Sequence, residues 1–428
     1  MTTAFSTDAA GALPGPEWLV ARRRGAAERF TSMALPSPEE EVWRYSRIGD
    51  LELDAYRPSD EPDSQLGGEV QELVDLADDD AHVVVTVDGR VVHDRPGRAN
   101  AIVVEPTDAD ASSLGAALTA DDALVELHDA FCIPVEIDVP AGTDGGTVVV
   151  IHRATTDATA SFPRLVVHAG QDAQVSVIEV FTSPAGTRTL GFPVTELVVD
   201  RDARLQHASV QVLGDQSWQI GRVASTVGQN ATLLSGTATF GGDYARLRTD
   251  TILDGRGAHG DLYAGYFGTG SQLLDFRTFQ DHVAPDTTSN LLFKGALGEK
   301  GASVYTGLIK IRPDARGAEA YQTNRNLKLS DDAWAESVPN LEIENNEVQC
   351  SHASTVGPVD PEQLFYLESR GVPTDRAERL IVKGIFDEVL ARLPLAGLRV
   401  TGPEQPRPRP RTEPPVSAER PTPPGMVT

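Results

Sequence analysis

The chain has 428 residues, of which 40% are hydrophobic, so it is long enough to bury a sizeable core in about two or three domains. Lys and Arg number 37 against 63 Asp and Glu, which gives a formal net charge of −26 at pH 7. A charge of this sign repels phosphate backbones at long range, so nucleic acid is not an expected partner.

The cysteine content and the opening residues predict where the protein resides. Two cysteines in so long a chain cannot make a disulfide framework, and "MTTAFSTDAAGALPGPEW" has no positive segment followed by an apolar core. No run approaches the roughly 20 apolar residues needed to span a bilayer. We therefore expect a cytoplasmic protein with no membrane partner.

Residues 1–80 are predicted to form a helical N-terminal region followed by an acidic connector. Pro16 is suited to a first helical turn, and Leu19, Ala26, Phe30 and Met33 follow near one face at helical spacing. Between residues 50 and 81 there are twelve carboxylates and one basic residue, Arg57. We interpret this part as a solvated, partly flexible connector rather than an interaction surface.

Residues 81–129 are predicted to form a small mixed α/β segment. "HVVVTVDGRVVHD" is two short β runs around Asp88-Gly89, which is a good hairpin signal. The following "SSLGAALTADDALVELHDAF" (112–131) returns to a helical pattern.

Residues 130–357 contain a degenerate repeat of short β-branched runs. A small turn residue, then Ala, then a strand recurs five times, and the first three intervals between the alanines are 30, 28 and 27 residues. The five alanines are Ala173, Ala203, Ala231, Ala258 and Ala302. A period in this range indicates a solenoid, so we predict a parallel β-helix core; a β-sandwich is the alternative that the period alone leaves open.

Residues 358–398 are predicted to form a C-terminal helical module. Asp360-Pro361 is a cap followed by a first-turn proline, and Gly371 ends the first helix. The second helix begins near Pro373 and keeps five apolar residues on one face: Ala377, Leu380, Ile381, Ile385 and Val389. Such a helix pair offers a compact surface to a partner. The Pro-rich residues 399–428 are predicted to be disordered.

Sequence motifs for common catalytic sites are absent. There is no G-x-x-x-x-G-K-[ST] phosphate loop, no G-x-S-x-G elbow, no H-E-x-x-H and no C-x-x-C. An ATPase, an ordinary hydrolase, a zinc protease or a self-contained iron–sulfur protein would normally show one of these. We therefore expect no catalytic residues and a non-catalytic role.

The segment "EVQCSHASTVG" (347–357) is the one place with ligand types at a useful spacing. On a β-strand, Cys350 and His352 project from the same face, and thiolate with imidazole suits iron, zinc or copper(I). Two ligands do not complete a site, so either this pair takes further ligands from another chain, or the segment is an ordinary strand with a buried thiol and a surface imidazole. Cys132 is predicted to pack as a small buried hydrophobe.

Three motifs closely resemble the SufB/SufD family, which are scaffold subunits of the SUF machinery for iron–sulfur cluster assembly. They are "YQTNRNLKLS" (321–330), "PNLEIENNEVQCSHASTVG" (339–357) and "QLFYLESRG" (363–371), and "EVWRYS" (41–46) is similar to another family element. The resemblance implies a mostly β fold, with a right-handed parallel β-helix core between a helical N-terminal region and a C-terminal helical module.

Within this family the chain is more similar to SufD than to SufB. Arg325 stands where SufB-type sequences carry a cysteine, and Ala353 where they carry a glutamate. The resemblance implies a β-helix heterodimer with a SufB-like paralogue, and a SufC-like ATPase bound through the C-terminal helices. The alternatives are a SufB-like homodimer and a β-helix carbohydrate-active enzyme.

The resemblance also assigns expected site residues. His352 is the candidate metal ligand for a nascent iron–sulfur cluster that is transient and shared with the partner subunit, with Cys350 a weaker candidate and no cofactor held tightly by this chain alone. The residues expected to dock the ATPase are Leu364, Phe365, Tyr366, Arg370 and Gly371.

Overall fold

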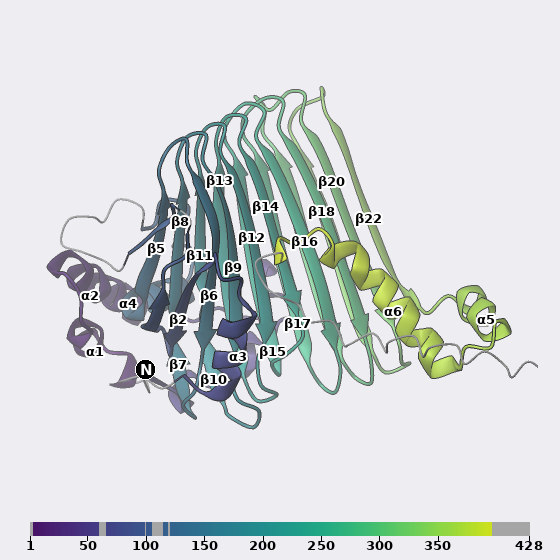
Figure 1. The fold of residues 1–428 in the computed structure, drawn as a ribbon, viewed down its shortest axis with the longest axis horizontal. Coiled ribbons are helices and arrows are strands. Elements are labelled where there is room, and N and C mark those ends of the chain that lie inside the picture. Colours follow the sequence, from purple (N-terminus) through teal and green to yellow (C-terminus); the bar gives the residue numbers. More distant parts are fainter. Residues whose placement is uncertain (1–2, 60–65, 99, 105–113, 119, 396–428) are drawn as a thin grey trace, which may run out of the picture.

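The computed structural model describes residues 3–59, 66–98, 100–104, 114–118 and 120–395. Two long, mostly parallel sheets lie face to face, and the chain passes from one to the other with nearly every strand (Figure 1). This is a β-helix, as the repeats predict, and not a sandwich of antiparallel sheets.

The first sheet runs from the N-terminal end of the solenoid to its C-terminal end. Its strands, in spatial order, are β4 (Ile102–Val104), β5 (Ile133–Val139), β8 (Pro163–Ala169), β11 (Val194–Val199), β13 (Trp218–Val227), β15 (Tyr244–Leu253), β17 (Leu273–His282), β19 (Ala302–Ile311) and β21 (Trp334–Ile343). The short strands β1 (Arg57–Pro58), β7 (Thr159–Ser161) and β10 (Thr189–Gly191) pair beside it.

The second sheet runs alongside. Its strands, in spatial order, are β3 (Arg90–Arg95), β2 (His82–Val87), β6 (Asp144–Arg153), β9 (Gln174–Thr182), β12 (Arg204–Val212), β14 (Thr232–Thr239), β16 (His259–Gly268), β18 (Thr288–Leu297), β20 (Glu319–Lys328) and β22 (Gln349–Pro358). The predicted hairpin at Asp88-Gly89 is confirmed, since β2 and β3 pair antiparallel across it.

The sequence repeat is the repeat of the solenoid. Arg204 pairs with Gln174, 30 residues earlier, and with Thr232, 28 residues later, which are the intervals between the first alanines. The residue before the alanine adopts a left-handed conformation at four of the five corners, at Asp172, Asp202, Asn230 and Gly257. Asp, Asn and Gly tolerate this conformation best, so the turn residues determine where each coil bends.

The N-terminal helices cover one end of the first sheet. They are α1 (Thr7–Ala12), α2 (Glu17–Ser32) and α4 (Ala123–Phe131), with 3-10 turns at Thr3–Phe5, Glu41–Trp43, Ile48–Asp50 and Leu53–Ala55. The predicted face of α2 is confirmed, since Leu19, Ala26 and Phe30 are buried. Residues 114–118, which the sequence predicts to be helical, form turns, because the helix begins only after Asp122, whose carboxylate caps Leu124 and Val125.

The acidic segment between residues 50 and 81 is more ordered than a solvated connector. It contains helix α3 (Gly68–Leu76), whose Val70 and Val74 are buried against the second sheet. Two apolar residues four apart anchor the helix while its carboxylates remain on the outer side. Residues 60–65 lie outside the described chain.

Two buried arginines of the first sheet, Arg246 and Arg277, hold the "EVWRYS" segment against that sheet, and we call this segment the strap. Arg246 lies 4.0 Å above the Trp43 ring, and Arg246 and Arg277 donate to the backbone carbonyls on either side of Trp43. Asp275, fully buried, accepts from Arg246 at 2.6 Å and from Arg277 at 2.8 Å. One carboxylate therefore orients both of the arginines that hold the strap.

The C-terminal helices are α5 (Pro361–Ser369) and α6 (Thr374–Leu390), as the sequence predicts. Helix α6 packs on the outer face of the second sheet, where Val389 is buried beside Tyr263, Phe386 lies against Phe240, and Glu388 pairs with Lys294. Helix α5 projects beyond the sheet (Figure 1) and has no buried residue. Among the described residues, no helix is long and apolar enough to cross a membrane.

We predict that Asp275→Ala lowers the free energy of unfolding by about 3–5 kcal/mol, because it leaves Arg246 and Arg277 buried without their carboxylate. Urea titration followed by circular dichroism measures this. The matched control is Asp281→Ala on the same strand, which removes a more exposed pair with Arg312 at 2.8 Å and should cost less than about 1 kcal/mol. Equal losses in the two variants would contradict the role of Asp275.

Candidate functional site: the open end of the solenoid

The C-terminal end of the solenoid leaves two strand edges open. In the described part of the chain, β21 pairs only with β19 and β22 only with β20. Both strands have ten residues, and most of their side chains are exposed or half-buried, whereas the strands behind them alternate between buried and exposed. Trp334, Ile343 and Val356, all more than 40% exposed, lie here.

His352 lies where the interior of the solenoid opens at its C-terminal end, a place that we call the mouth. Along β20, every second residue from Ala320 to Asn326 is buried and therefore faces inward. His352 pairs in register with Gln322, one of these buried residues, so its side chain belongs to the inward-facing row of the last strand. No further coil covers it in the described chain, and the imidazole is exposed.

Cys350 shares this face with His352 but has a different environment. It pairs with Ala320, is half-buried, and packs against a cluster that includes Ile309 and Ile311. Burial raises the pKa of its thiol, which disfavours the thiolate that binds metal. The two residues are thus together, as the strand spacing predicts, with His352 the more available ligand.

Beneath the mouth, the interior is filled with hydrogen-bonded amides and hydroxyls. Asn324 Nδ2 donates to Tyr266 Oη at 3.0 Å, Tyr266 Oη donates to Asn326 Oδ1 at 2.7 Å, and Asn326 Nδ2 donates to Asn324 Oδ1 at 2.8 Å. All three residues are at most 3% exposed. Sequence reasoning missed this layer, although the alternating polar residues of "QTNRN" carry it, because such alternation ordinarily marks a solvated face.

A second interior cluster surrounds Glu179, several coils away. His152 Nε2 lies 3.1 Å from Oε1, while His207 Nε2 and Thr195 Oγ1 lie 2.8 and 2.7 Å from Oε2. Burial disfavours the ionised carboxylate, but the hydrogen bonds from the two imidazoles outweigh it and lower the pKa of Glu179 from 4.5 to about 2.

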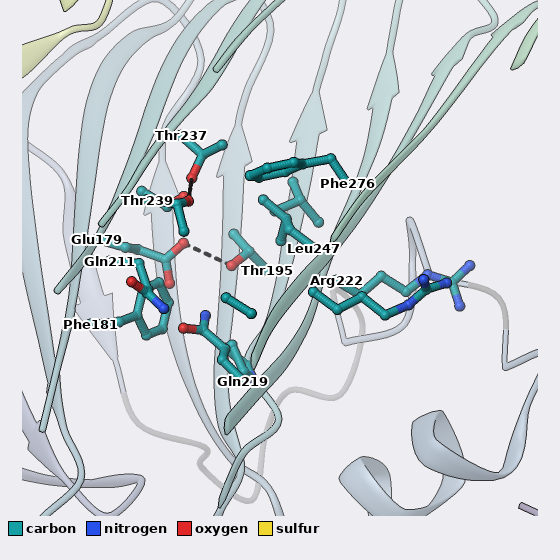
Figure 2. Close-up of a pocket in the computed structure, with 15 residues that line it drawn as sticks. Glu179, Phe181, Thr195, Gln211, Gln219, Arg222, Thr237, Thr239, Leu247 and Phe276 are labelled. Atoms are coloured by element: carbon teal, nitrogen blue, oxygen red, sulfur yellow. Dashed lines mark hydrogen bonds between the residues drawn. The ribbon is translucent and has the colours of Figure 1, made fainter. Parts of the chain in front are cut away.

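A small internal cavity adjoins this carboxylate. Figure 2 shows Glu179 and Thr195 joined across it, with Gln211, Gln219 and Thr239 nearby. The cavity leaves about 20 Å³ for the centre of a water-sized molecule, which is enough for a single water. Both carboxylate oxygens are already engaged by imidazoles and a hydroxyl, so the cluster is a structural network of the interior.

A third group, His128, Asp129 and Cys132, brings three potential ligand atoms within 4.8 Å of one another. Its surroundings oppose metal binding, because Arg22 and Arg164 donate to the two oxygens of Asp129 at 2.8 and 3.0 Å. Burial lowers the pKa of His128 to about 3 and raises that of Cys132 to about 11. Cys132 is fully buried in the core, which confirms its predicted packing role.

The five predicted docking residues lie on the exposed helix α5 or in the turn that directly follows it. Phe365 is 71% and Tyr366 58% exposed, whereas Leu364 is half-buried. The Arg370 guanidinium lies 5.3 Å from the centre of the Tyr366 ring. Gly371 has φ +81°, the left-handed conformation that turns the chain into α6.

A comparison with known protein families assigns the chain to a family. The family described as "SUF system FeS cluster assembly, SufBD core domain" matches residues 152–385. The chain belongs to the SufBD family. The match covers the interior clusters, the open end and most of the C-terminal helices, and it agrees with the resemblance in the sequence motifs.

Several curated proteins are similar to this SufBD chain. A protein of Mycobacterium bovis named as an iron–sulfur cluster assembly SufBD family protein is 40% identical over 212 residues, 48% of this chain and 53% of the relative. The SufD proteins of Bacillus subtilis and Escherichia coli are 26% identical over 415 residues (90% of this chain, 92% of the relative) and 30% identical over 229 residues (54% of each). The chain spans about half the length of the mycobacterial relatives that it matches.

Arg325 and Ala353, the two positions at which the sequence resembles SufD rather than SufB, lie in exposed places. Arg325 is on the outer face of β20, between the buried Asn324 and Asn326, and Ala353 is exposed on β22. Side chains alternate between the two faces of a strand. Arg325 is next to the inward-facing Asn324, and Ala353 is next to His352, so neither Arg325 nor Ala353 faces the interior.

The ionised Glu179 should make the stability of this SufBD chain depend on acid pH. Because the folded pKa of about 2 lies below the ordinary value of 4.5, the carboxylate contributes stability above about pH 4.5 that is lost as the pH falls towards 2. The shift corresponds to on the order of 3 kcal/mol. We predict that Glu179→Gln is less stable at pH 7 and has a flatter stability profile between pH 4.5 and 3, measured by urea unfolding.

The control for this prediction is Glu342→Gln, which removes an exposed carboxylate from β21 and should keep the wild-type slope. A Glu179→Gln profile that parallels the wild type would show that the carboxylate is not the group that titrates.

Proposed function

We propose that the chain is a SufD-like, non-catalytic scaffold subunit that assembles nascent iron–sulfur clusters in a complex with a SufB-like paralogue and a SufC-like ATPase. The observation that carries this proposal is the open end of the solenoid, where two ten-residue strand edges and an exposed histidine occur together. Membership of a cluster-assembly family supports an iron–sulfur cluster as the cargo, and the free edges support the binding of a second subunit at this end.

The open edges favour pairing with another β-helix. An unpaired strand exposes a row of backbone donors and acceptors that another strand can satisfy, and natural proteins usually block such edges with charge, proline or a covering loop. Here β22 carries no Asp, Glu, Lys or Arg, and its one proline, Pro358, stands at its last position. Strand β21 carries Glu336, Glu342 and, in its middle, Pro339, so the edge of β22 is the less protected of the two. A SufB-like paralogue of matching cross-section could continue both sheets.

His352 is the ligand that this chain would contribute to the shared cluster. An exposed imidazole at the mouth can bind iron through one ring nitrogen, and Cys350 is held back by its half-buried position and raised thiol pKa. Iron–sulfur clusters usually take four protein ligands, so one or two from this chain leave the cluster dependent on the partner. The cluster would therefore be transient and shared, and this chain alone would hold none tightly.

The C-terminal helices suit a docking site for the ATPase. Phe365 and Tyr366 expose large apolar surfaces on α5, which is the type of anchor that dominates protein interfaces. Helix α6 connects that site to the second sheet through Phe386 and Val389. Movement of a docked ATPase would thus be transmitted to the strands that end at the mouth.

The cellular location that we propose is the cytoplasm. Both cysteines are free thiols, and a cluster-building site with an accessible thiol requires a reducing compartment.

The test is to co-express the chain, tagged, with a SufB-like and a SufC-like partner, and to measure iron and sulfide in the purified complex. His352→Ala should retain both partners but bind iron about tenfold more weakly or worse, because even the outer partners of a metal ligand are worth that much. The control is His259→Ala, a half-exposed histidine paired with Asp261 at 3.0 Å on β16.

Each outcome of this experiment has a separate meaning. If neither partner co-purifies with the wild-type chain, the scaffold proposal fails. If both co-purify and His352→Ala keeps the iron and sulfide of the wild type, the scaffold proposal stands but the ligand assignment is wrong. A stable complex of the chain with itself, loaded with cluster, would favour the homodimer instead.

A further inference from the structure

Gln322 lies directly behind His352 in the interior of the solenoid. The two residues pair in register on the parallel strands β20 and β22, so their side chains extend from the same face of the sheet. Neighbouring strands in a sheet are roughly 4.8 Å apart, which brings the end of a glutamine side chain within reach of the imidazole. Gln322 is only 1% exposed, so its position is set by the packed interior rather than by solvent.

The amide nitrogen of Gln322 is anchored on the side away from the last strand. Nε2 donates to Tyr305 Oη, and this hydroxyl also lies 3.0 Å from Thr278 Oγ1. Tyr305 and Thr278 are buried on the two preceding strands of the first sheet.

Gly307 makes this anchor possible. A Cβ atom at position 307 would lie 1.8 Å from Gln322 Nε2 and 2.3 Å from Tyr305 Oη, distances at which atoms overlap. Only glycine leaves room there for the amide to reach the tyrosine. Strand β19 therefore leaves space for the Gln322 side chain at Gly307.

The other end of the same amide is unsatisfied. Gln322 Oε1 is buried and has no hydrogen-bond partner among the described residues. Buried carbonyl oxygens are nearly always paired, because leaving one without a donor is costly. The residue of β22 that pairs in register with Gln322 is His352, whose imidazole can supply a ring N–H.

We infer that Gln322 is a positioning residue for His352: when the exposed imidazole turns towards it, its free Oε1 accepts a hydrogen bond from one ring N–H and leaves the other ring nitrogen unprotonated and directed out of the mouth. Histidines that bind metals almost always donate their second ring nitrogen to a carbonyl or carboxylate, which fixes both tautomer and ring orientation. Tyr305 and Gly307 would in turn fix the amide. This inference rests on the proposed role of His352 as an iron ligand and specifies how the ligand is presented.

The direct test is the tautomer of His352 in the full-length chain, read at pH 8 from the ¹⁵N chemical shifts of the histidine rings. The His352 signals are identified by their loss in His352→Ala. We expect one dominant tautomer in the wild type and a redistributed tautomer ratio in Gln322→Met, which removes the acceptor and keeps the length of the side chain. Gln322→Glu, which retains an acceptor oxygen, should restore the dominant tautomer.

A matched control and a second route make the test specific. Gln280→Met replaces another glutamine that is 1% exposed in the interior, on β17, and should leave the His352 tautomer unchanged. Gly307→Ala should disturb the tautomer without altering Gln322 itself, because the added methyl group displaces the anchored amide. It also keeps the inference testable if Gln322→Met does not fold.

Iron binding by the complex with its partners gives the functional readout. Gln322→Met should weaken it by about 10–100-fold and Gln322→Glu should not. An unchanged tautomer and unchanged iron binding in Gln322→Met, or an equal effect of Gln280→Met, would overturn the inference. If Gln322→Met shifts the tautomer while His352→Ala leaves iron binding intact, the hydrogen bond stands and the proposed ligand role is the part that fails.

Discussion

The in-register stacking of parallel coils is the constraint on which the rest of the structure depends. Each strand satisfies its backbone by pairing with the strand one coil earlier and one coil later, as Arg204 does with Gln174 and Thr232. The last strand of each sheet has backbone groups with no strand to pair with, so the terminal coil must be covered or left open. The first sheet is capped by antiparallel β4 at one end, while β21 and β22 remain open at the other in the part of the chain that is described. An incomplete end is what a subunit that shares its cargo with a partner requires.

The interior explains how a solenoid can be both rigid and chemically polar. Apolar residues such as Val177 and Leu205 fill much of the interior, the Glu179 cluster interrupts them in the earlier coils, and the hydrogen-bonded layer of Tyr266, Asn324 and Asn326 lies in the later ones. Such a hydrogen-bonded layer holds its side chains in one arrangement, because displacing one of them leaves a buried group unpaired. His352 extends this layer into solvent, so its environment is set by a rigid support rather than by a loop. The strap held through Asp275 stiffens the other sheet in the same way.

Much of the fold could be predicted from the sequence because the spacing between the turn residues equals the number of residues in one coil. The intervals between Ala173, Ala203 and Ala231 are the strand-to-strand register itself, and Asp or Asn before each alanine marks the corner. Helix α3 was missed because its two buried valines are outnumbered by carboxylates. Ile343 alternates with Glu342 and Glu344, a pattern typical of a strand with one buried face, yet it is 44% exposed, since no coil in the described part of the chain covers it. Periodicity gives the face of a residue, but it cannot say where the stack ends.

The central claim is that another β-helix pairs with β21 and β22. The most direct test is to measure amide hydrogen exchange of the full-length chain, with and without a SufB-like paralogue. The account predicts slower exchange in the complex along residues 334–343 and 349–358, whose outer backbone groups would become hydrogen-bonded, with little change in interior strands such as β12 and β14. A complex that forms while exchange along these two edge strands stays as fast as in the free chain would contradict it.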